Sequence, residues 1–160
     1  MVLLIKNLLF TLLIPGTVAV YVPLLLGRGH PRASGGVLAC ALFLLGLGGC
    51  IYVWCVWDFA TFGRGTPAPL DAPKKLVVRG LYRYTRNPMY VGVLTIVLGW
   101  AAFFESSMLV IYAAAVLSAF ELFILLYEEP HLLREFGPEY QTYRDRVGRW
   151  FFTRKRRQPS

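Results

Sequence analysis

Charged side chains are scarce in this sequence. Only 16 % of the 160 residues are Asp, Glu, Lys or Arg, whereas soluble domains average about 25 %. Histidine occurs twice and cysteine three times, and the cysteines form no C-x-x-C pair, which argues against a metal centre and a disulfide framework. Because 56 % of the residues are hydrophobic and the mean hydropathy is +0.52, the composition excludes an ordinary soluble domain and indicates a membrane protein.

The hydrophobic residues gather in four blocks, and the charges fall between them. A helix needs roughly 20 apolar residues to cross a bilayer, and every block except the third reaches that length. We expect an all-α integral membrane protein, a single domain over residues 1–160 with four transmembrane helices. The expected spans are residues 2–26, 37–62, 88–104 and 108–127, followed by an amphipathic interfacial segment over residues 131–157.

The basic residues are distributed unevenly between the connections. The chain has 17 Lys and Arg against 9 Asp and Glu, and most of the basic residues lie in residues 63–87 or after residue 133. The positive-inside rule places both segments, and both termini, in the cytoplasm. We therefore expect a multi-pass protein of the cell (inner) membrane, with a basic tail that contacts anionic lipid rather than nucleic acid.

Asn87 and Pro88 predict the start of the third span. Asn is a favoured N-cap and Pro suits the first helical position, so both residues have a structural explanation. The same helix start offers free N–H groups and a partial positive charge, which suit a carboxylate or phosphate of a ligand. Arg86 adds a positive charge, Tyr90 offers a ring for stacking, and Gly92 permits a ligand to approach the backbone closely.

Two adjacent carboxylates, Glu128 and Glu129, stand where the fourth span is expected to end. The C-terminal end of a helix favours Lys or Arg, so two acids there break a local rule, as functional sites often do. Glu121 lies seven residues before Glu128 and is expected on the same helix face, roughly 10 Å deeper. Two interpretations remain open: the acids form ion pairs that hold the preceding loop to the helix, or they bind a ligand.

A stripe of apolar residues follows these acids at intervals of three and four residues. This spacing is typical of an amphipathic helix at the membrane interface. Gly137 and Pro138 are expected to break or begin this helix. The stripe consists of Phe136, Tyr140, Tyr143, Val147 and Trp150.

Two longer runs resemble a known group of enzymes. Residues 80–92 read G-L-Y-R-Y-T-R-N-P-M-Y-V-G, and residues 128–144 read E-E-P-H-L-L-R-E-F-G-P-E-Y-Q-T-Y-R. Both are similar to the integral-membrane methyltransferases of the isoprenylcysteine carboxyl methyltransferase and phospholipid methyltransferase group, over about residues 63–150. The resemblance implies S-adenosylmethionine as cofactor, bound at the cytoplasmic ends of the last two spans, and a lipidic or small apolar methyl acceptor.

The charged cluster and the resemblance together give the candidate site residues. The candidate cofactor-binding residues are Tyr82, Arg86, Asn87, Pro88, Tyr90, Gly92, Glu128, Glu129 and His131. The candidate catalytic residues are Glu121, Glu129 and Arg86, and the candidate acceptor or lid residues are Tyr140, Tyr143 and Arg146. Asn87 stands where isoprenylcysteine enzymes commonly have His, and Gly148 where related chains often have Pro, so the identity of the acceptor does not carry over.

Other classes of function remain open at this point. A reductase of the sterol-reductase type has a similar membrane architecture and uses NADPH, but its phosphates favour arginines over Glu128 and Glu129. A non-enzymatic four-helix membrane protein would lose stability, and no ligand binding, on substitution of these glutamates. A methyltransferase that acts on a hydroxyl or an amine needs a general base, for which Glu121, Glu129 and His131 are candidates.

Overall fold

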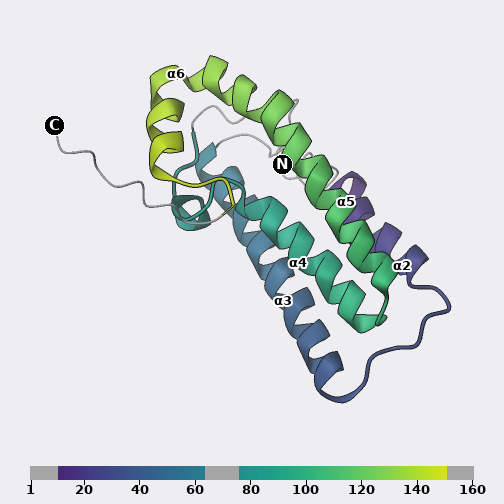
Figure 1. The fold of residues 1–160 in the computed structure, drawn as a ribbon. Coiled ribbons are helices and arrows are strands. Elements are labelled where there is room, and N and C mark those ends of the chain that lie inside the picture. The colour runs from purple at the N-terminus through teal and green to yellow at the C-terminus, as the bar shows by residue number, and fades with distance from the viewer. Residues whose placement is uncertain (1–10, 64–75, 151–160) are drawn as a thin grey trace.

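The computed structural model describes residues 11–63 and 76–150, and all regular elements in these ranges are helical (Figure 1). Three of the helical segments contain π-helical turns. In chain order the elements are the first helix Thr11–Leu26, which includes η1 (Thr17–Tyr21) and α2 (Val22–Leu26), then α3 (Gly35–Asp58), η2 (Phe59–Gly63), the 3₁₀ turn η3 (Gly80–Arg83), α4 (Pro88–Phe103), α5 (Ser107–Phe123), η4 (Ile124–Glu128) and α6 (Glu129–Arg146).

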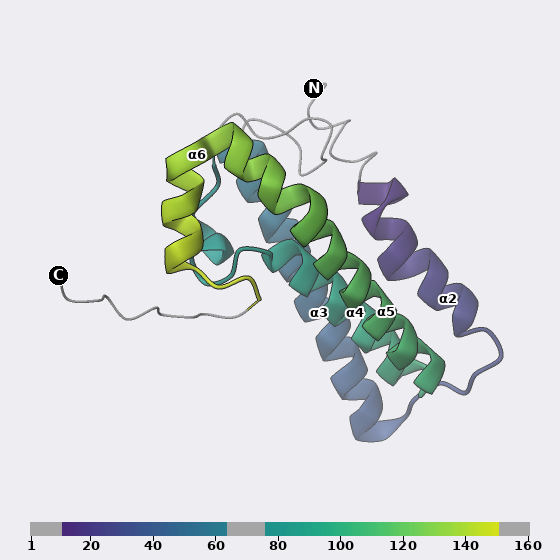
Figure 2. The same ribbon diagram turned by 45° about the horizontal axis from the view of Figure 1, so that its top comes forward.

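Helix α4 lies at the centre of the bundle. Figures 1 and 2 show α3, α4 and α5 side by side with α4 in the middle, and the first helix packs against α4 and α5. Because the helices alternate in direction, the start of α4 meets the end of α5 at one end of the bundle. The buried residues of α4 are Pro88, Met89, Gly92, Val93, Val97, Gly99 and Ala101.

The backbones of α3 and α4 approach each other closely at two glycines. A Cβ atom on Gly48 would lie 2.7 Å from the carbonyl oxygen of Gly92, and one on Gly92 would lie 3.1 Å from the carbonyl oxygen of Gly48. Small residues permit such contacts in membrane helices, where packing replaces the hydrophobic effect as the driving force. The close approach that we expected between Gly92 and a ligand is therefore an approach to α3.

Two of the helices are long and apolar enough to cross a membrane. These are Gly35–Phe62 and Ser107–Arg146, while Thr11–Leu26 and Pro88–Phe103 are shorter apolar helices. Large apolar side chains such as Phe43, Ile111 and Leu126 are between 66 % and 76 % exposed, which is the surface expected of helices that face lipid. The expected four-span arrangement is thus supported for two helices, and residues 2–10 of the expected first span lie outside the described residues.

The helix of the fourth expected span does not end at Tyr127, where the sequence predicted its end. The helix continues from α5 through η4 into α6 and turns back at Gly137, whose φ of 49° and ψ of −123° are not helical. Figures 1 and 2 show the sharp bend in α6. The expected break at Gly137 and Pro138 is confirmed. Glu128 and Glu129 therefore lie within a continuous helical run. The prediction that they stand at the C-terminal end of a helix was wrong.

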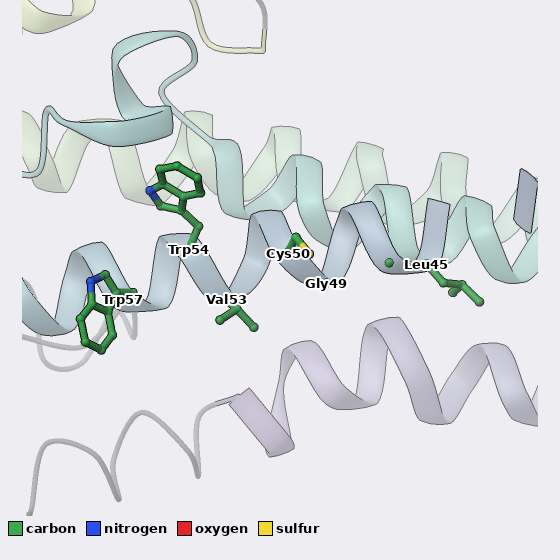
Figure 3. Close-up of a pocket in the computed structure, with 7 residues that line it drawn as sticks. Leu45, Gly49, Cys50, Val53, Trp54 and Trp57 are labelled. Atoms are coloured by element: carbon green, nitrogen blue, oxygen red, sulfur yellow. The ribbon is translucent and has the colours of Figure 1, made fainter. Parts of the chain in front are cut away.

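The outer face of α3 carries a shallow hollow that contains no formally charged side chain. It is lined by Leu45, Gly46, Gly49, Cys50, Val53, Trp54 and Trp57, most of which Figure 3 labels. The three cysteines are free thiols; Cys40 and Cys50 are exposed, and Cys55 is buried. This hollow belongs to the apolar surface of the bundle, and its polar side-chain groups are the indole N–H groups of Trp54 and Trp57 and the thiol of Cys50.

Candidate active site

Two arginines converge on Glu129 at the end of the bundle where α4 begins. Nη1 of Arg86 and Nε of Arg149 each lie 2.9 Å from the same carboxylate oxygen of Glu129. The side chains of Arg86 and Glu129 are only 11 % and 12 % exposed. Charge-assisted hydrogen bonds of this length, shielded from water, are strong. Glu129 is thus neutralised within the protein.

Arg149 also binds Glu121, which corrects the expected alignment of the acids. Its Nη1 forms an ion pair with Glu121, and Nε1 of Trp150 donates to the other carboxylate oxygen at 2.7 Å. The spacing predicted that Glu121 shares a face with Glu128. A π-helical turn accommodates one extra residue, and η4 lies between the two positions. Glu121 and Glu129, eight residues apart, therefore share Arg149 instead.

The segment that carries Arg149 is bound to the start of α4. The carbonyl oxygen of Arg149 accepts hydrogen bonds from Oγ1 of Thr85 at 2.8 Å and Nδ2 of Asn87 at 3.2 Å. Asn87 occupies the N-cap position of α4, with Pro88 as the first helical residue, but its side chain makes no capping hydrogen bond. Arg149 is a site residue that the sequence did not predict. No local pattern marks it, because its carboxylate partners lie 20 and 28 residues earlier.

Glu128 has a different environment from its neighbour. It accepts a hydrogen bond of 2.9 Å from the hydroxyl of Tyr90, and no ion pair to Glu128 is present among the described residues. The ring of Tyr90 stacks on Phe120 with 4.5 Å between the centroids, so one of its faces is not free for a ligand. Burial raises the pKa of the Glu128 carboxyl, which lies beyond the apolar stretch that ends at Tyr127. Glu128 is thus the carboxylate of the cluster that still needs a cation.

The tyrosines of the expected amphipathic segment contact the protein itself. The hydroxyl of Tyr140 accepts a hydrogen bond from Arg86 at 3.3 Å, and the hydroxyl of Tyr143 donates to the carbonyl oxygen of Tyr82 at 2.7 Å. Tyr82 and Tyr140 are buried. Tyr140 and Tyr143 of the apolar stripe therefore pack against Arg86 and the loop before α4. Burial raises the pKa of all three phenols, so their hydroxyls remain protonated.

A cavity of about 470 Å³ opens beside this cluster, within the range of roughly 300–1,000 Å³ that is typical of ligand sites. Polar residues of η3, the start of α4, η4 and α6 form one part of its wall. Apolar residues form the rest, among them residues of the first helix, η2, α4 and α5. The polar residues are Tyr82, Arg86, Asn87, Tyr90, Glu128, His131 and Tyr143. The apolar residues include Ile14, Val18, Phe59, Met89, Val93, Phe120 and Phe123.

Two nitrogen atoms of residues that line this cavity lack hydrogen-bond partners among the described residues. Nε of Arg86 and Nε2 of His131 are buried and make no hydrogen bond to any described residue. Buried polar groups are nearly always satisfied, so such exceptions mark places where a ligand or water belongs. Glu121, Gly92 and Arg146 do not line the cavity. Arg146 is exposed at the end of α6.

Fold and site define a helical membrane protein with a charged ligand cavity at one end of its bundle. A model of the phospholipid methyltransferase family matches residues 36–139. The chain belongs to this family and is a membrane methyltransferase, which confirms the resemblance seen in the sequence. No curated protein and no solved structure matches the chain. Family membership favours methyl transfer over the reductase and the non-enzymatic alternatives.

Proposed function

We propose that this protein transfers a methyl group from S-adenosylmethionine to a lipidic or small apolar acceptor at the cytoplasmic face of the membrane. One observation carries the proposal. Glu128 and Arg86 line the same cavity. The carboxylate of Glu128 accepts a hydrogen bond from Tyr90, and Nε of Arg86 has no hydrogen-bond partner among the described residues. A ligand that bears an ammonium and a carboxylate group can pair its ammonium group with Glu128 and its carboxylate with Arg86.

The charges of the cluster fit this donor. The carboxylates of Glu121, Glu128 and Glu129 face the guanidinium groups of Arg86 and Arg149, which leaves one negative charge in excess. A donor with sulfonium, ammonium and carboxylate groups carries one net positive charge. A buried charge is costly unless it is paired, so this ligand completes the cluster whereas the phosphates of NADPH would oppose it.

We assign distinct roles to the residues around the donor. Glu128 binds the ammonium group and Nε of Arg86 binds the carboxylate, while the hydroxyl of Tyr90 orients Glu128. Glu129 holds Arg86 in place, so we propose it as a positioning residue. Glu121 is engaged by Arg149 and Trp150, away from the cavity, and we propose that it fixes the C-terminal segment.

The bound donor supplies an electrophilic methyl group on a positively charged sulfur. Departure of that sulfur as a neutral thioether needs no acid, so the protein mainly aligns the reactants and excludes water. The apolar part of the cavity suits a lipidic acceptor that enters from the bilayer. The second half of α6 covers the polar part, with Tyr143 on the cavity wall and Tyr140 against Arg86.

Equilibrium binding of labelled S-adenosylmethionine to the purified protein in detergent tests this function. We expect saturable binding, weakened at least about tenfold by Glu128→Gln, because a hydrogen bond to a charged group is worth about 1.5–3 kcal/mol. The matched control is Glu135→Gln, which alters an exposed glutamate on α6 and is expected to bind normally. The proposal is wrong if the wild type shows no saturable binding, or if NADPH binds in place of the methyl donor.

A further inference from the structure

Asp58, the last residue of α3, is a buried acid that the donor site described above does not use. Its side chain is 2 % exposed, and Oδ1 lies 3.5 Å from Nε of Arg79, whose side chain is half exposed. Oδ2 is buried and has no hydrogen-bond partner among the described residues. Burial of a carboxylate is costly, and one ion pair with a half-exposed arginine compensates poorly for that cost. A contribution to stability therefore does not explain Asp58.

The turn at Gly80 packs directly on the carboxylate of Asp58. A Cβ atom on Gly80 would lie 2.3 Å from Oδ2 of Asp58, and the φ of Gly80 is 56°, a conformation that disfavours other residues. The guanidinium carbon of Arg79 lies 3.2 Å from the centre of the Phe62 ring. The carboxylate of Asp58 and the ring of Phe62 thus hold this turn against the end of the α3 and η2 run.

The same turn places Tyr82 on the wall of the cavity. The backbone N–H of Tyr82 donates to the carbonyl oxygen of Arg79 at 3.1 Å. The ring of Tyr82 meets that of Phe59 edge to face, with 5.5 Å between the centroids, and both residues line the cavity. The carbonyl oxygen of Tyr82 accepts the hydrogen bond of Tyr143. A short series of contacts therefore joins Asp58 to the part of α6 that covers the polar wall.

We propose that Asp58 is a positioning residue of the methyl-donor site. Through Arg79 it fixes η3, and through Tyr82 it holds Tyr143 at the cavity, so that the second half of α6 stays closed over a bound donor. This proposal rests on the proposed function. Loss of the charge at position 58 then leaves the fold intact and lets the bound donor leave faster.

The first test compares stability with donor release. Asn has the shape of Asp without its charge, and Asp58→Asn leaves behind an arginine that water can reach. We expect this variant to melt no lower than the wild type and to release labelled S-adenosylmethionine about fivefold faster or more. The matched control is Arg83→Gln, which removes an exposed charge from the same turn and is expected to match the wild type in both measurements.

The second test asks whether Asp58 acts through Tyr143. Tyr143→Phe removes the hydroxyl that makes the last contact of the series, and we expect it to speed donor release. Adding Asp58→Asn to this variant is expected to give no further increase, because both changes break the same path. If Asp58 only stabilised the fold, the two effects on the release rate would multiply instead.

Hydrogen exchange of the protein without ligand gives a readout that does not depend on the donor. In Asp58→Asn we expect faster exchange at the backbone amides of Tyr82 and Tyr84, which donate to carbonyl oxygens of this turn, and unchanged exchange in the middle of α4. If Asp58→Asn fails to fold, Arg79→Gln breaks the same ion pair from its exposed side, with the same expected pattern.

The contrary results are distinct from one another. Unchanged donor release in both Asp58→Asn and Arg79→Gln overturns the proposal, and so do multiplied effects in the double variant. A lower melting temperature with faster exchange throughout the helices also overturns it, because Asp58 would then stabilise the whole fold. Absence of donor binding by the wild type would refute the proposed function, whereas faster exchange confined to η3 in Asp58→Asn would still support the role of Asp58 in fixing this turn.

Discussion

At the scale of single residues, two adjacent glutamates differ in whether a cationic side chain is bound to them. Glu129 is satisfied by Arg86 and Arg149, whereas Glu128 has the hydroxyl of Tyr90. Successive residues of a helix project about 100° apart, so neighbours in sequence reach different partners. Removing the charge of Glu129 leaves the mostly buried guanidinium group of Arg86 without its carboxylate partner and is expected to lower stability, whereas removing that of Glu128 is expected to weaken ligand binding.

The environment of Glu128 makes donor binding depend on pH. Burial raises the pKa of this carboxyl above its usual value of 4.5, so a larger fraction is protonated and neutral at a given mildly acidic pH. The ammonium group of a donor favours the ionised form and lowers this pKa, so binding releases protons. We expect donor affinity to rise as pH increases through the raised pKa. Calorimetry in buffers of different ionisation enthalpy measures the proton release, which Glu128→Gln is expected to abolish.

The residues of the site differ in how well the local sequence predicts them. Asn87 and Pro88 mark the start of α4 through their own conformational preferences, so that start was predicted correctly. The resemblance singled out the paired glutamates, but it did not distinguish them. Arg149 was not found, because its role depends on the bend at Gly137, which brings residues far apart in sequence together. Long-range ion pairs leave no periodic signal in a single sequence.

At the scale of elements, the contact between α3 and α4 depends on the size of one residue. Gly48 and Gly49 are adjacent on α3, yet a Cβ atom on Gly48 would meet the backbone of Gly92 at 2.7 Å, whereas one on Gly49 would meet nothing within 4 Å. Because the two glycines are adjacent in one helix, an alanine at either position has the same intrinsic effect on helix stability. A difference between the two variants therefore reports the packing of α3 against α4.

We expect Gly48→Ala to destabilise the protein and Gly49→Ala to leave it unchanged or slightly more stable. Forcing a methyl group into a filled helix contact costs about 1–3 kcal/mol, while Ala in place of Gly within a helix gains up to about 1 kcal/mol. Thermal unfolding in detergent measures both variants under the same conditions. Equal melting temperatures for the two variants would show that α3 and α4 do not meet at Gly48.

The helices themselves were largely predictable, because long apolar blocks separated by charges have few alternatives. Expected residues 37–62 and 88–104 correspond to Gly35–Phe62 and Pro88–Phe103. The continuation of α5 into α6 was not predicted. The paired acids were expected to stand at a helix end, but the helix continues through η4 and has Pro130 in the first turn of α6, where Pro is tolerated.

At the scale of the whole molecule, the charged cluster and the polar cavity wall lie at one end of an otherwise apolar bundle. The cluster of Glu121, Glu129, Arg86 and Arg149 and the polar wall of the cavity lie at one end, and residues 27–34 and the turn between α4 and α5 lie at the other (Figure 1). Under the proposed function, a lipidic acceptor would enter this cavity from the bilayer and the polar donor from water, so that the two reactants would meet only inside the protein.

The two ends of the bundle allow its predicted orientation in the membrane, with the charged end in the cytoplasm, to be tested. In a variant without native cysteines, we expect Arg28→Cys to react with a membrane-impermeant maleimide added to intact cells and Arg83→Cys to react only after lysis. Both positions are exposed in the structure, and the positive-inside rule places the second in the cytoplasm. The reverse labelling pattern would place the charged end of the bundle outside.

The π-helical turn between residues 124 and 128 has a consequence for how this chain can change over time. A π-helical turn accommodates one residue more than an α-helical turn. If one residue from 124 to 127 were deleted and the helix closed to α geometry, Glu129 would therefore keep its place beside Glu121 and Arg149. A deletion between Glu129 and Gly137 would instead rotate the residues that follow it by about 100°. The short stretch that contains Leu126, whose side chain is 76 % exposed, thus tolerates a change of length that the next turns of the helix do not.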